Sequence, residues 1–297
     1  MLNFRSIRAE DKPLYDSYRH RDVTDASEGA FATVFIWDDY YHLKVADNGE
    51  FLFLRFEIDG KAPSYLFPIG SGDLNAAVNE LDEYSKSRGE SLIFKLVTEE
   101  NAKKLEEAFR GRFNYIYDRD CADYMYSAES LKTLSGKKLH AKRNHLNYFA
   151  ENYDYSFEWV DSREKLGECA EEAYRLVEGK THNINPFELG AMKKYFENYF
   201  SFNQTGAFLR VGGRIAAMSF GEKLTANTAL VQIELADEEL RGAYQMINKL
   251  FCEKAFADCE FVNREEDMGI EGLRKAKEGY RPLRLVDKYT VTEKENE

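Results

Sequence analysis

The chain has 297 residues, of which 43% are hydrophobic and 32% charged, and its formal net charge is −12. This composition is typical of a folded globular protein and argues against a disordered or fibrous chain. At about 150 residues per domain the length predicts two domains. The acidic balance argues against a general nucleic-acid binder, and we expect no DNA partner.

Localisation and redox state follow from what the sequence lacks. The N-terminal stretch MLNFRSIRAEDKP has no hydrophobic signal core, and no apolar run approaches the about 18 residues of a membrane span. We therefore expect a cytoplasmic protein without an integral membrane segment. Cys121, Cys169, Cys252 and Cys259 form no C-x-x-C pair. Buried thiols are expected rather than a zinc or redox site, and no metal ligand set is predicted.

The first half of the chain alternates helices and strands. We expect a helix over 9–20, a strand over 51–58, a return strand over 64–69, a helix after Asp73, a strand over 91–98 and a helix over 99–109. Asp59-Gly60 suits the hairpin turn. Asp73 and Thr98 carry side-chain oxygens that cap helices, so they predict where two helices begin.

The second half repeats this pattern. We expect a helix from 161 or 162 to 177, strands over 206–211 and 214–224 around Gly212-Gly213, a strand over 228–235, a helix over 244–256, a strand over 259–263, a helix over 270–279 and a closing strand over 283–292. Antiparallel hairpins are mixed with β-α-β crossovers. The predicted fold class is therefore α/β (α+β), with mixed sheets flanked by helices.

The two halves each contain a hairpin, a helix and a further strand in the same order. This similarity is one of pattern and not of letters. It predicts an N-terminal domain over 1–126, a basic connecting helix over 127–152 and a C-terminal domain over 153–297. One large α/β domain is the alternative.

A basic stretch, SGKKLHAKRNHLNYF (135–149), contains no acid in a strongly acidic chain. On a helix, its side chains at i, i+4 and i+7 share one face and would attract phosphate or carboxylate groups. A solvated basic helix face is the alternative interpretation. The two histidines are five residues apart, roughly 140° around a helix, so one metal ion is not chelated from one face. The candidate ligand-binding residues here are Lys138, Lys142, Arg143, Asn144 and His145.

A second stretch, NREEDMGIEGLRKAKEGY (263–280), begins where a strand ends and a helix follows. Loops of this kind often hold ligands in α/β proteins. Its acids would otherwise serve as helix caps, and a capped surface loop with ion pairs is the alternative. The candidate ligand-binding residues here are Asn263, Arg264, Arg274, Lys275 and Lys277.

A third candidate is the turn ELRGAYQ (239–245), between the strand over 228–235 and the next helix. A glycine-containing turn before a helix exposes backbone N–H groups that can hold phosphate. Arg241 and Gly242 are therefore candidate ligand-binding residues. With a single glycine, a simple turn is the alternative.

The order of elements in the second half resembles the GNAT acyltransferase fold. That resemblance implies two splayed strands, with acyl-CoA between them and its pyrophosphate on the loop before the following helix. The family loop reads Arg/Gln-x-x-Gly-x-Gly/Ala. Arg241 and Gly242 look like its start, but Tyr244 and Met246 stand at the two glycine positions. Bulky residues there hinder close backbone approach to a pyrophosphate.

A more specific resemblance covers nearly the whole chain. The stretches 135–149 and 263–282, together with FATVFIW (31–37), resemble the phosphatidylglycerol lysyltransferase C-terminal-domain-like family of bacteria. This resemblance implies two tandem GNAT-like domains, as in the Fem-type aminoacyltransferases. Those relatives take their acyl group from aminoacyl-tRNA, which fits the altered CoA loop.

Two functional hypotheses follow. The first is an acyl- or aminoacyltransferase that uses acyl-CoA or aminoacyl-tRNA as donor and an amine or hydroxyl as acceptor. Glu234, Glu265 and Asp267 lie near expected strand ends and are candidates for its catalytic base. The second is a non-catalytic module of the same fold that binds a phosphorylated ligand or RNA. The chain contains no G-x-S-x-G and no G-x-x-x-x-G-K-[ST], which argues against a serine hydrolase and a P-loop nucleotide hydrolase.

Overall fold

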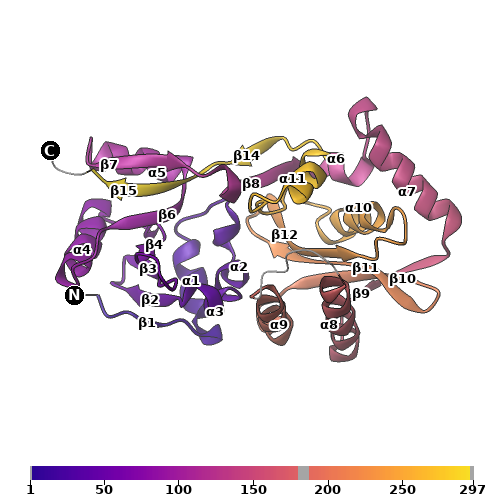
Figure 1. The fold of residues 1–297 in the computed structure, drawn as a ribbon, viewed down its shortest axis with the longest axis horizontal. Helices are drawn as coiled ribbons and strands as arrows, with labels where there is room; N and C mark the ends of the chain where they lie inside the picture. The colour runs from indigo at the N-terminus through magenta and orange to yellow at the C-terminus, as the bar shows by residue number, and fades with distance from the viewer. Residues whose placement is uncertain (1, 180–186, 295–297) are drawn as a thin grey trace. The chain divides into compact units, whose positions relative to one another are not determined.

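The structure, a computed structural model, describes residues 2–179 and 187–294. The chain forms two compact units. The first holds the described residues up to Ala122 together with those from Val286 onward, and the second spans Asp123–Leu285. Figure 1 shows that each unit is built on its own sheet with helices beside it.

The described residues of the first unit form an eight-stranded sheet in the order β1-β2-β3-β4-β6-β15-β7, with β5 paired to β3. The strands are β1 (Arg5–Ser6), β2 (Lys44–Asp47), β3 (Phe51–Phe56), β4 (Ser64–Tyr65), β5 (Ile69–Gly70), β6 (Ile93–Thr98), β7 (Phe113–Tyr117) and β15 (Lys288–Glu293). The helices are α1 (Lys12–Arg19), α2 (Phe31–Phe35), α3 (Asp38–Tyr41), α4 (Leu74–Ser87) and α5 (Glu99–Ala108). Among the described strands of this sheet, only β4 and β6 are parallel neighbours, so the sheet is mixed as predicted.

Local sequence signals set the helix starts in this unit. The Asp73 side chain accepts a hydrogen bond from the backbone N–H of Ala76, and the Thr98 side chain accepts one from Asn101. Both helix starts predicted from these residues are confirmed. The helices cover an apolar core that includes Phe53, which is fully buried on β3.

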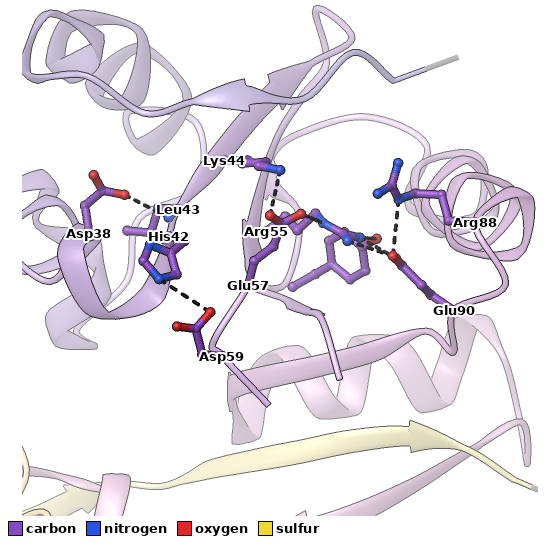
Figure 2. Close-up of polar contacts among 10 residues, drawn as sticks. Asp38, His42, Leu43, Lys44, Arg55, Glu57, Asp59, Arg88 and Glu90 are labelled. Atoms are coloured by element: carbon purple, nitrogen blue, oxygen red, sulfur yellow. Dashed lines mark hydrogen bonds and ion pairs between the residues drawn. The ribbon is translucent and has the colours of Figure 1, made fainter. Parts of the chain in front are cut away.

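A buried arginine lies within the first unit. The Arg55 side chain is 1% exposed and donates to Glu57 at 2.7 Å and to the Tyr65 hydroxyl at 2.7 Å. Two further hydrogen bonds, of 2.5 and 2.9 Å, join its guanidinium to the two oxygens of Glu90. Figure 2 shows this network, in which the exposed Arg88 side chain also donates a hydrogen bond to Glu90. Every guanidinium nitrogen of Arg55 therefore has a partner.

The described residues of the second unit form a seven-stranded sheet in the order β14-β8-β13-β12-β11-β10-β9. The strands are β8 (Asp123–Ser127), β9 (Tyr155–Trp159), β10 (Thr205–Val211), β11 (Arg214–Lys223), β12 (Thr228–Ala236), β13 (Phe261–Asn263) and β14 (Arg284–Val286). The helices are α6 (Ala128–Thr133), α7 (His140–Asn152), α8 (Arg163–Glu178), α9 (Glu188–Asn198), α10 (Ala243–Ala255) and α11 (Glu271–Glu278). Figure 1 shows α8 and α9 on one face of this sheet and α10 on the other.

Two segments lie elsewhere than the sequence analysis placed them. The expected strand over 283–292 divides at Asp287 into β14, in the second sheet, and β15, which lies between β6 and β7 in the first sheet. The expected connecting helix contains α7, which belongs to the second unit and packs against α10. The stretch 283–292 contains no glycine or proline that would predict a break at Asp287, and strand pairing over long sequence distance is not readable from periodicity.

The cysteines follow the expectation in part. Cys169, Cys252 and Cys259 are buried, whereas Cys121 is half-buried. Burial raises the pKa of the Cys252 thiol to about 12. A thiol of that pKa stays protonated and unreactive at neutral pH.

Candidate functional site

Two neighbouring strands of the second sheet separate part-way along their length. β12 and β13 pair in parallel from Thr228↔Phe261 to Leu230↔Asn263. β13 ends there, whereas β12 continues to Ala236. The pairing of the two strands therefore ends at Leu230, and the chain after β13 continues as a loop beside the rest of β12.

An irregularity in β12 turns Glu234 toward α10. The pairing of β11 with β12 shifts register between Phe220 and Gly221. Val231 packs in an apolar cluster with α10, and Glu234, three residues later, accepts a hydrogen bond from Asn248 of that helix. Residues of a regular strand alternate between faces, so two residues three apart share a face because of the register shift.

Glu234 is the centre of a buried polar cluster. Its carboxylate is 9% exposed and accepts hydrogen bonds from Arg264 Nη2 at 2.7 Å and Asn248 Nδ2 at 2.9 Å. The Arg264 guanidinium lies 4.8 Å from the ring centroid of Tyr280 and 5.6 Å from that of Tyr126. Burial opposes the charge of Arg264, but Glu234, Tyr126 and Tyr280 together outweigh it, and the pKa of Arg264 is raised.

Helix α7 contributes Lys142 to this cluster. Lys142 Nζ lies 4.2 Å from the ring centroid of Tyr280. Burial, and then the charge of Arg264, lower the pKa of Lys142. The basic face predicted on this helix therefore reaches the separated strands through Lys142.

The turn before α10 is covered by α7. Gly242 has φ +94°, and a Cβ atom there would lie 2.1 Å from the His145 carbonyl oxygen and 2.9 Å from Phe149 Cβ. Only glycine fits, because both the backbone conformation and the space exclude a side chain. Next to it, Arg241 donates to His145 Nδ1 at 3.4 Å and stacks on Tyr148 at 4.5 Å. Helix α7 and this turn therefore form one packed surface.

The loop after β13 is held by its own polar side chains. Asn263 donates to Asp123 at 2.9 Å and accepts from the backbone N–H of Glu265 at 2.7 Å. Glu265 has φ +53°, a left-handed conformation that is uncommon for a side chain of this size. Lys277, itself buried, donates to the Arg264 carbonyl at 2.5 Å. These contacts fix the path of the backbone that carries Arg264.

Asp267 closes the same loop. Its carboxylate is fully buried and accepts from Arg274 Nε and Nη2, each at 2.8 Å, from the Tyr124 hydroxyl at 2.6 Å and from the backbone N–H of Gly269 at 2.9 Å. Burial opposes ionisation, but the hydrogen bonds from Arg274 and Tyr124 outweigh it and lower the pKa of Asp267. A carboxylate that accepts this many hydrogen bonds stabilises the folded conformation of the loop.

The remaining candidates lie apart from Glu234. Lys138 is exposed, and Lys275 pairs with Glu271 on the outer face of α11. Arg143 donates to the carbonyls of Leu134 and Gly136, and Asn144 contacts His140. The structure thus brings six predicted residues together around α10, namely Lys142, His145, Glu234, Arg241, Gly242 and Arg264.

Three buried residues near Glu234 were not selected from the sequence, namely Asn248 and Tyr280 of the cluster and Ser219, the cross-strand partner of Glu234. Ser219, Asn248 and Tyr280 are at most 4% exposed. Asn248 could have been found as the polar residue within the apolar stripe of a helix. Ser219 carries no such signal, because its position depends on the pairing of β11 with β12.

Two general properties of the described chain bear on function. Among residues 2–179 and 187–294, no group of three or more His, Cys, Asp or Glu side chains is arranged to hold a metal ion. Nor is any helix in those ranges long and apolar enough to cross a membrane.

Comparisons with known proteins agree with this geometry. In sequence, the chain is 24% identical over 190 residues to the uncharacterized protein MYCGA3080 of Mycoplasmoides gallisepticum, a match that spans 59% of this chain and 58% of that relative. A conserved protein of unknown function from Bacteroides thetaiotaomicron has a solved structure that is 31% identical, covers 99% of this chain and 100% of its own, and gives a TM-score of 0.92.

More distant structures share the fold. L-PGS from Bacillus licheniformis is 16% identical over 97% of this chain and 93% of its own, with a TM-score of 0.67. FemX is 10% identical over 97% and 96%, with a TM-score of 0.63. A tandem GNAT protein of the clavulanic acid biosynthesis pathway is 11% identical over 99% and 98%, with a TM-score of 0.50. The predicted pair of tandem GNAT-like domains is confirmed, and this fold is shared with FemX.

The family itself is established by the sequence match, which runs over residues 21–292 and so takes in both units of the structure. The resemblance predicted from the basic helix and from the loop after β13 is confirmed. The chain belongs to the family described as phosphatidylglycerol lysyltransferase, C-terminal.

Proposed function

We propose that the second unit transfers an aminoacyl group from aminoacyl-tRNA to an amine or hydroxyl acceptor. Membership of the lysyltransferase family and the fold shared with L-PGS and FemX support an aminoacyltransferase. The separated strands β12 and β13 lie where this fold places its donor, and Glu234, Arg264 and Lys142 lie beside them.

The observation that carries the choice of donor is the covered turn at Gly242. In the GNAT pattern this turn offers its backbone to the pyrophosphate of acyl-CoA. Here the His145 carbonyl and Phe149 of α7 lie against it, and a carbonyl oxygen repels a phosphate. Met246, at the second glycine position of the pattern, is buried. These features favour a donor without a CoA pyrophosphate.

The reaction requires one bond to form and one to break. The acceptor's electron pair adds to the ester carbonyl carbon, the bond from that carbon to the tRNA ribose oxygen breaks, and the ribose oxygen takes a proton while the acceptor loses one. Positioning and a base are the needs of such a step. Asp267 and Glu234 accept hydrogen bonds at both oxygens, which favours structural roles. Glu265 lies on the loop after β13 with φ +53°, and it is the predicted base candidate that we carry forward to the test.

The test is a transfer assay with radiolabelled aminoacyl-tRNA and two acceptors, phosphatidylglycerol vesicles and a peptide amine. We expect label to move from charged tRNA to one acceptor, whereas acetyl-CoA neither donates nor raises the Tm. Glu265→Gln should lower the single-turnover rate by about 100-fold or more. The neighbouring change Glu266→Gln serves as the control and should leave the rate unchanged.

Other outcomes point elsewhere. Binding of charged tRNA without transfer to either acceptor, falling steeply with salt, would favour the non-catalytic RNA-binding module. Stabilisation by acetyl-CoA would mean that α7 moves away from the turn and that the donor is acyl-CoA.

A further inference from the structure

The sheet of the first unit ends on a strand whose outer side is open. β7 is the last strand in the sheet order, and Figure 1 shows it at the margin of that unit's sheet. Ile116 of this strand is 58% exposed and Tyr117 is 45% exposed. No strand within the described ranges pairs with this side of β7. The outer side is therefore accessible to a strand of another molecule.

The backbone of β7 alternates between β15 and the open side. The Asp118 N–H, directly after the strand, donates to the Lys288 carbonyl at 2.9 Å, and the register of β7 with β15 is regular. In an antiparallel pair, hydrogen-bonded positions alternate with positions whose N–H and C=O groups point away from the neighbour. Counting back from Asp118, the backbone groups of Phe113, Tyr115 and Tyr117 point to the open side.

The other end strands of the described sheets are protected in ways that β7 is not. Proteins protect edge strands by making them short, by charging them or by covering them. β1 has two residues and β14 three, and each includes an arginine. β9 has five residues, but it carries Glu158, and the carbonyl of its last residue, Trp159, accepts from the Lys165 ammonium. β7 also has five residues, FNYIY, without charge or proline. Its edge is therefore the best suited of the four to pairing.

The residues around β7 complement a second copy of themselves. The sequence over 110–120 reads RGRFNYIYDRD, with two arginines before the strand and two aspartates after it. In an antiparallel pair centred on Tyr115, the start of one copy lies opposite the end of the other. This centring gives two pairs of opposite charge, Arg112 with Asp118 and Arg110 with Asp120 of the second copy. Arg119 falls opposite a glycine, Gly111.

The hydrogen-bonding pattern selects the same centring. Backbone groups that point to the open side have to meet each other, and centring on Tyr115 pairs Phe113 with Tyr117 of the second copy and Tyr115 with itself. Moving the centre to Asn114 or Ile116 leaves one of these three residues and one of the two charge pairs unused. Aromatic side chains directly opposite each other also stabilise paired strands.

We infer that two copies of this chain associate through β7, as an antiparallel pair of strands centred on Tyr115. Each copy donates and accepts the same hydrogen bonds, so the contact is symmetric and closes at two copies. One pair of strands is a small contact beside the about 1,200–2,000 Å² of stable complexes, so we expect a dimer that dissociates on dilution. The association requires no ligand and does not depend on the proposed transfer.

The test measures the mass of the full chain in solution by sedimentation velocity, from about 1 µM to about 200 µM. We expect the mass to rise from the 34.5 kDa of one chain toward twice that value. Over the same range, hydrogen exchange of a peptide covering 113–117 should slow, because three amide N–H groups gain partners.

Two proline variants test which strand is used. Tyr117→Pro removes one N–H on the open side, a position where edge strands accept proline. Trp159→Pro is the matched control, because Trp159 is also the aromatic last residue of an end strand and is 38% exposed. Its N–H points away from β10, since the next residue, Val160, donates to Gly206. Tyr117→Pro should weaken the dimer about tenfold or more, because two hydrogen bonds are lost, and the control should leave it unchanged.

Two charge variants test the register. Arg112 also pairs with Asp82 and Glu293 of its own chain, so Arg110 is the arginine that we change. Arg110→Asp and Asp120→Arg each place like charges opposite each other twice in the dimer and should weaken it about fivefold or more. The double variant restores opposite charges and should recover the wild-type affinity to within about twofold.

A mass of one chain at every concentration would overturn the inference. A dimer that Tyr117→Pro leaves intact, or that Trp159→Pro weakens equally, would also overturn it. If Tyr117→Pro lowers the Tm sharply, the charge variants decide, because Arg110 and Asp120 are exposed. A double variant that is as weak as the two single changes combined would mean that the pair is not centred on Tyr115.

Discussion

Each unit buries an arginine next to the place where its two parallel strands meet, and the two arginines differ in how fully they are satisfied. Arg55 lies beside the pairing of Tyr65 with Phe94, and all three of its guanidinium nitrogens donate to Glu57, Glu90 or Tyr65. Arg264 directly follows the pairing of Leu230 with Asn263, and its Nη1 has no partner. The Arg55 guanidinium is thus fully hydrogen-bonded by side chains of its own unit, whereas that of Arg264 is not.

The backbones around the two arginines are alike. In each sheet a parallel strand, β6 or β13, is followed in the sheet by a strand from the distant part of the chain, β15 or β8. Two residues beyond the parallel pairing each unit has a non-glycine residue in the left-handed region, Leu96 with φ +56° and Glu265 with φ +53°. The two units thus share this left-handed backbone conformation, and they differ in the side chains that surround it.

The largest effect is expected from removing the strand that the first sheet receives from the end of the chain. A chain that ends at Asp287 lacks β15, so β6 and β7 lose their common neighbour. It also lacks Lys288, whose ammonium is 0% exposed and pairs with Glu28 at 2.7 Å. We expect the first unit to lose its whole folding stability, of the order of 5–15 kcal/mol, while the second stays folded.

Hydrogen exchange resolved by peptide measures this outcome. Protection should vanish from β3 and β6 and persist in β11 and β12. A control chain that ends at Lys294 keeps β15 and should exchange like the full chain. Full protection of β6 in the shorter chain would contradict the assignment of β15 to the first sheet.

The second-largest effect is expected from breaking the hydrogen-bond network of Arg55. Arg55→Met leaves the Tyr65 hydroxyl and Glu90 without their buried partner. Breaking one member of a buried ion pair costs about 3–5 kcal/mol. We expect the free energy of unfolding of the first unit in urea to fall by that amount.

Arg88→Gln is the matched control, since Arg88 reaches the same carboxylate at 3.2 Å but is 48% exposed. Exposed ion pairs contribute less than about 1 kcal/mol. Equal losses for Arg55→Met and Arg88→Gln would mean that the buried network contributes no more than a surface contact.

Much of this architecture could be predicted from local sequence signals. Asp73, Thr98 and Ser162 cap helices where the oxygen-bearing side chains indicated, and the Gly212-Gly213 hairpin joins β10 to β11. These features depend on a few neighbouring residues, so short-range patterns contain them. Asp267 shows the limit of such patterns, because nothing local reveals that Arg274 and Tyr124 enclose it.

The features that could not be predicted from the sequence depend on contacts between residues that are far apart in the chain. The placement of β15 in the first sheet depends on pairing across about two hundred positions with β6. The gathering of Ser219, Asn248 and Tyr280 around Glu234 combines a cross-strand register, a helix face and a loop. The family resemblance supplied the fold, but side-chain partners come only from the three-dimensional packing.

The smallest effect concerns the α7 surface over the Gly242 turn. Burial, and then the charges of Arg241 and Lys142, lower the pKa of His145 from its usual 6.5. Between the lowered value and 6.5 the unfolded chain binds a proton that the folded protein does not. Stability therefore falls as the pH falls through that window. His145→Gln removes this titration, so the Tm loss between neutral and mildly acidic pH should shrink by about 1 °C.

His140→Gln is the matched control for this prediction. His140 lies on the same helix but is exposed and contacts Asn144 rather than Arg241. This variant should keep the wild-type dependence of Tm on pH. If both variants flatten the curve equally, the effect belongs to the charge of the helix as a whole. If only His145→Gln does so, the contact with Arg241 holds α7 against the turn in solution, which is the feature that argues against acyl-CoA as donor.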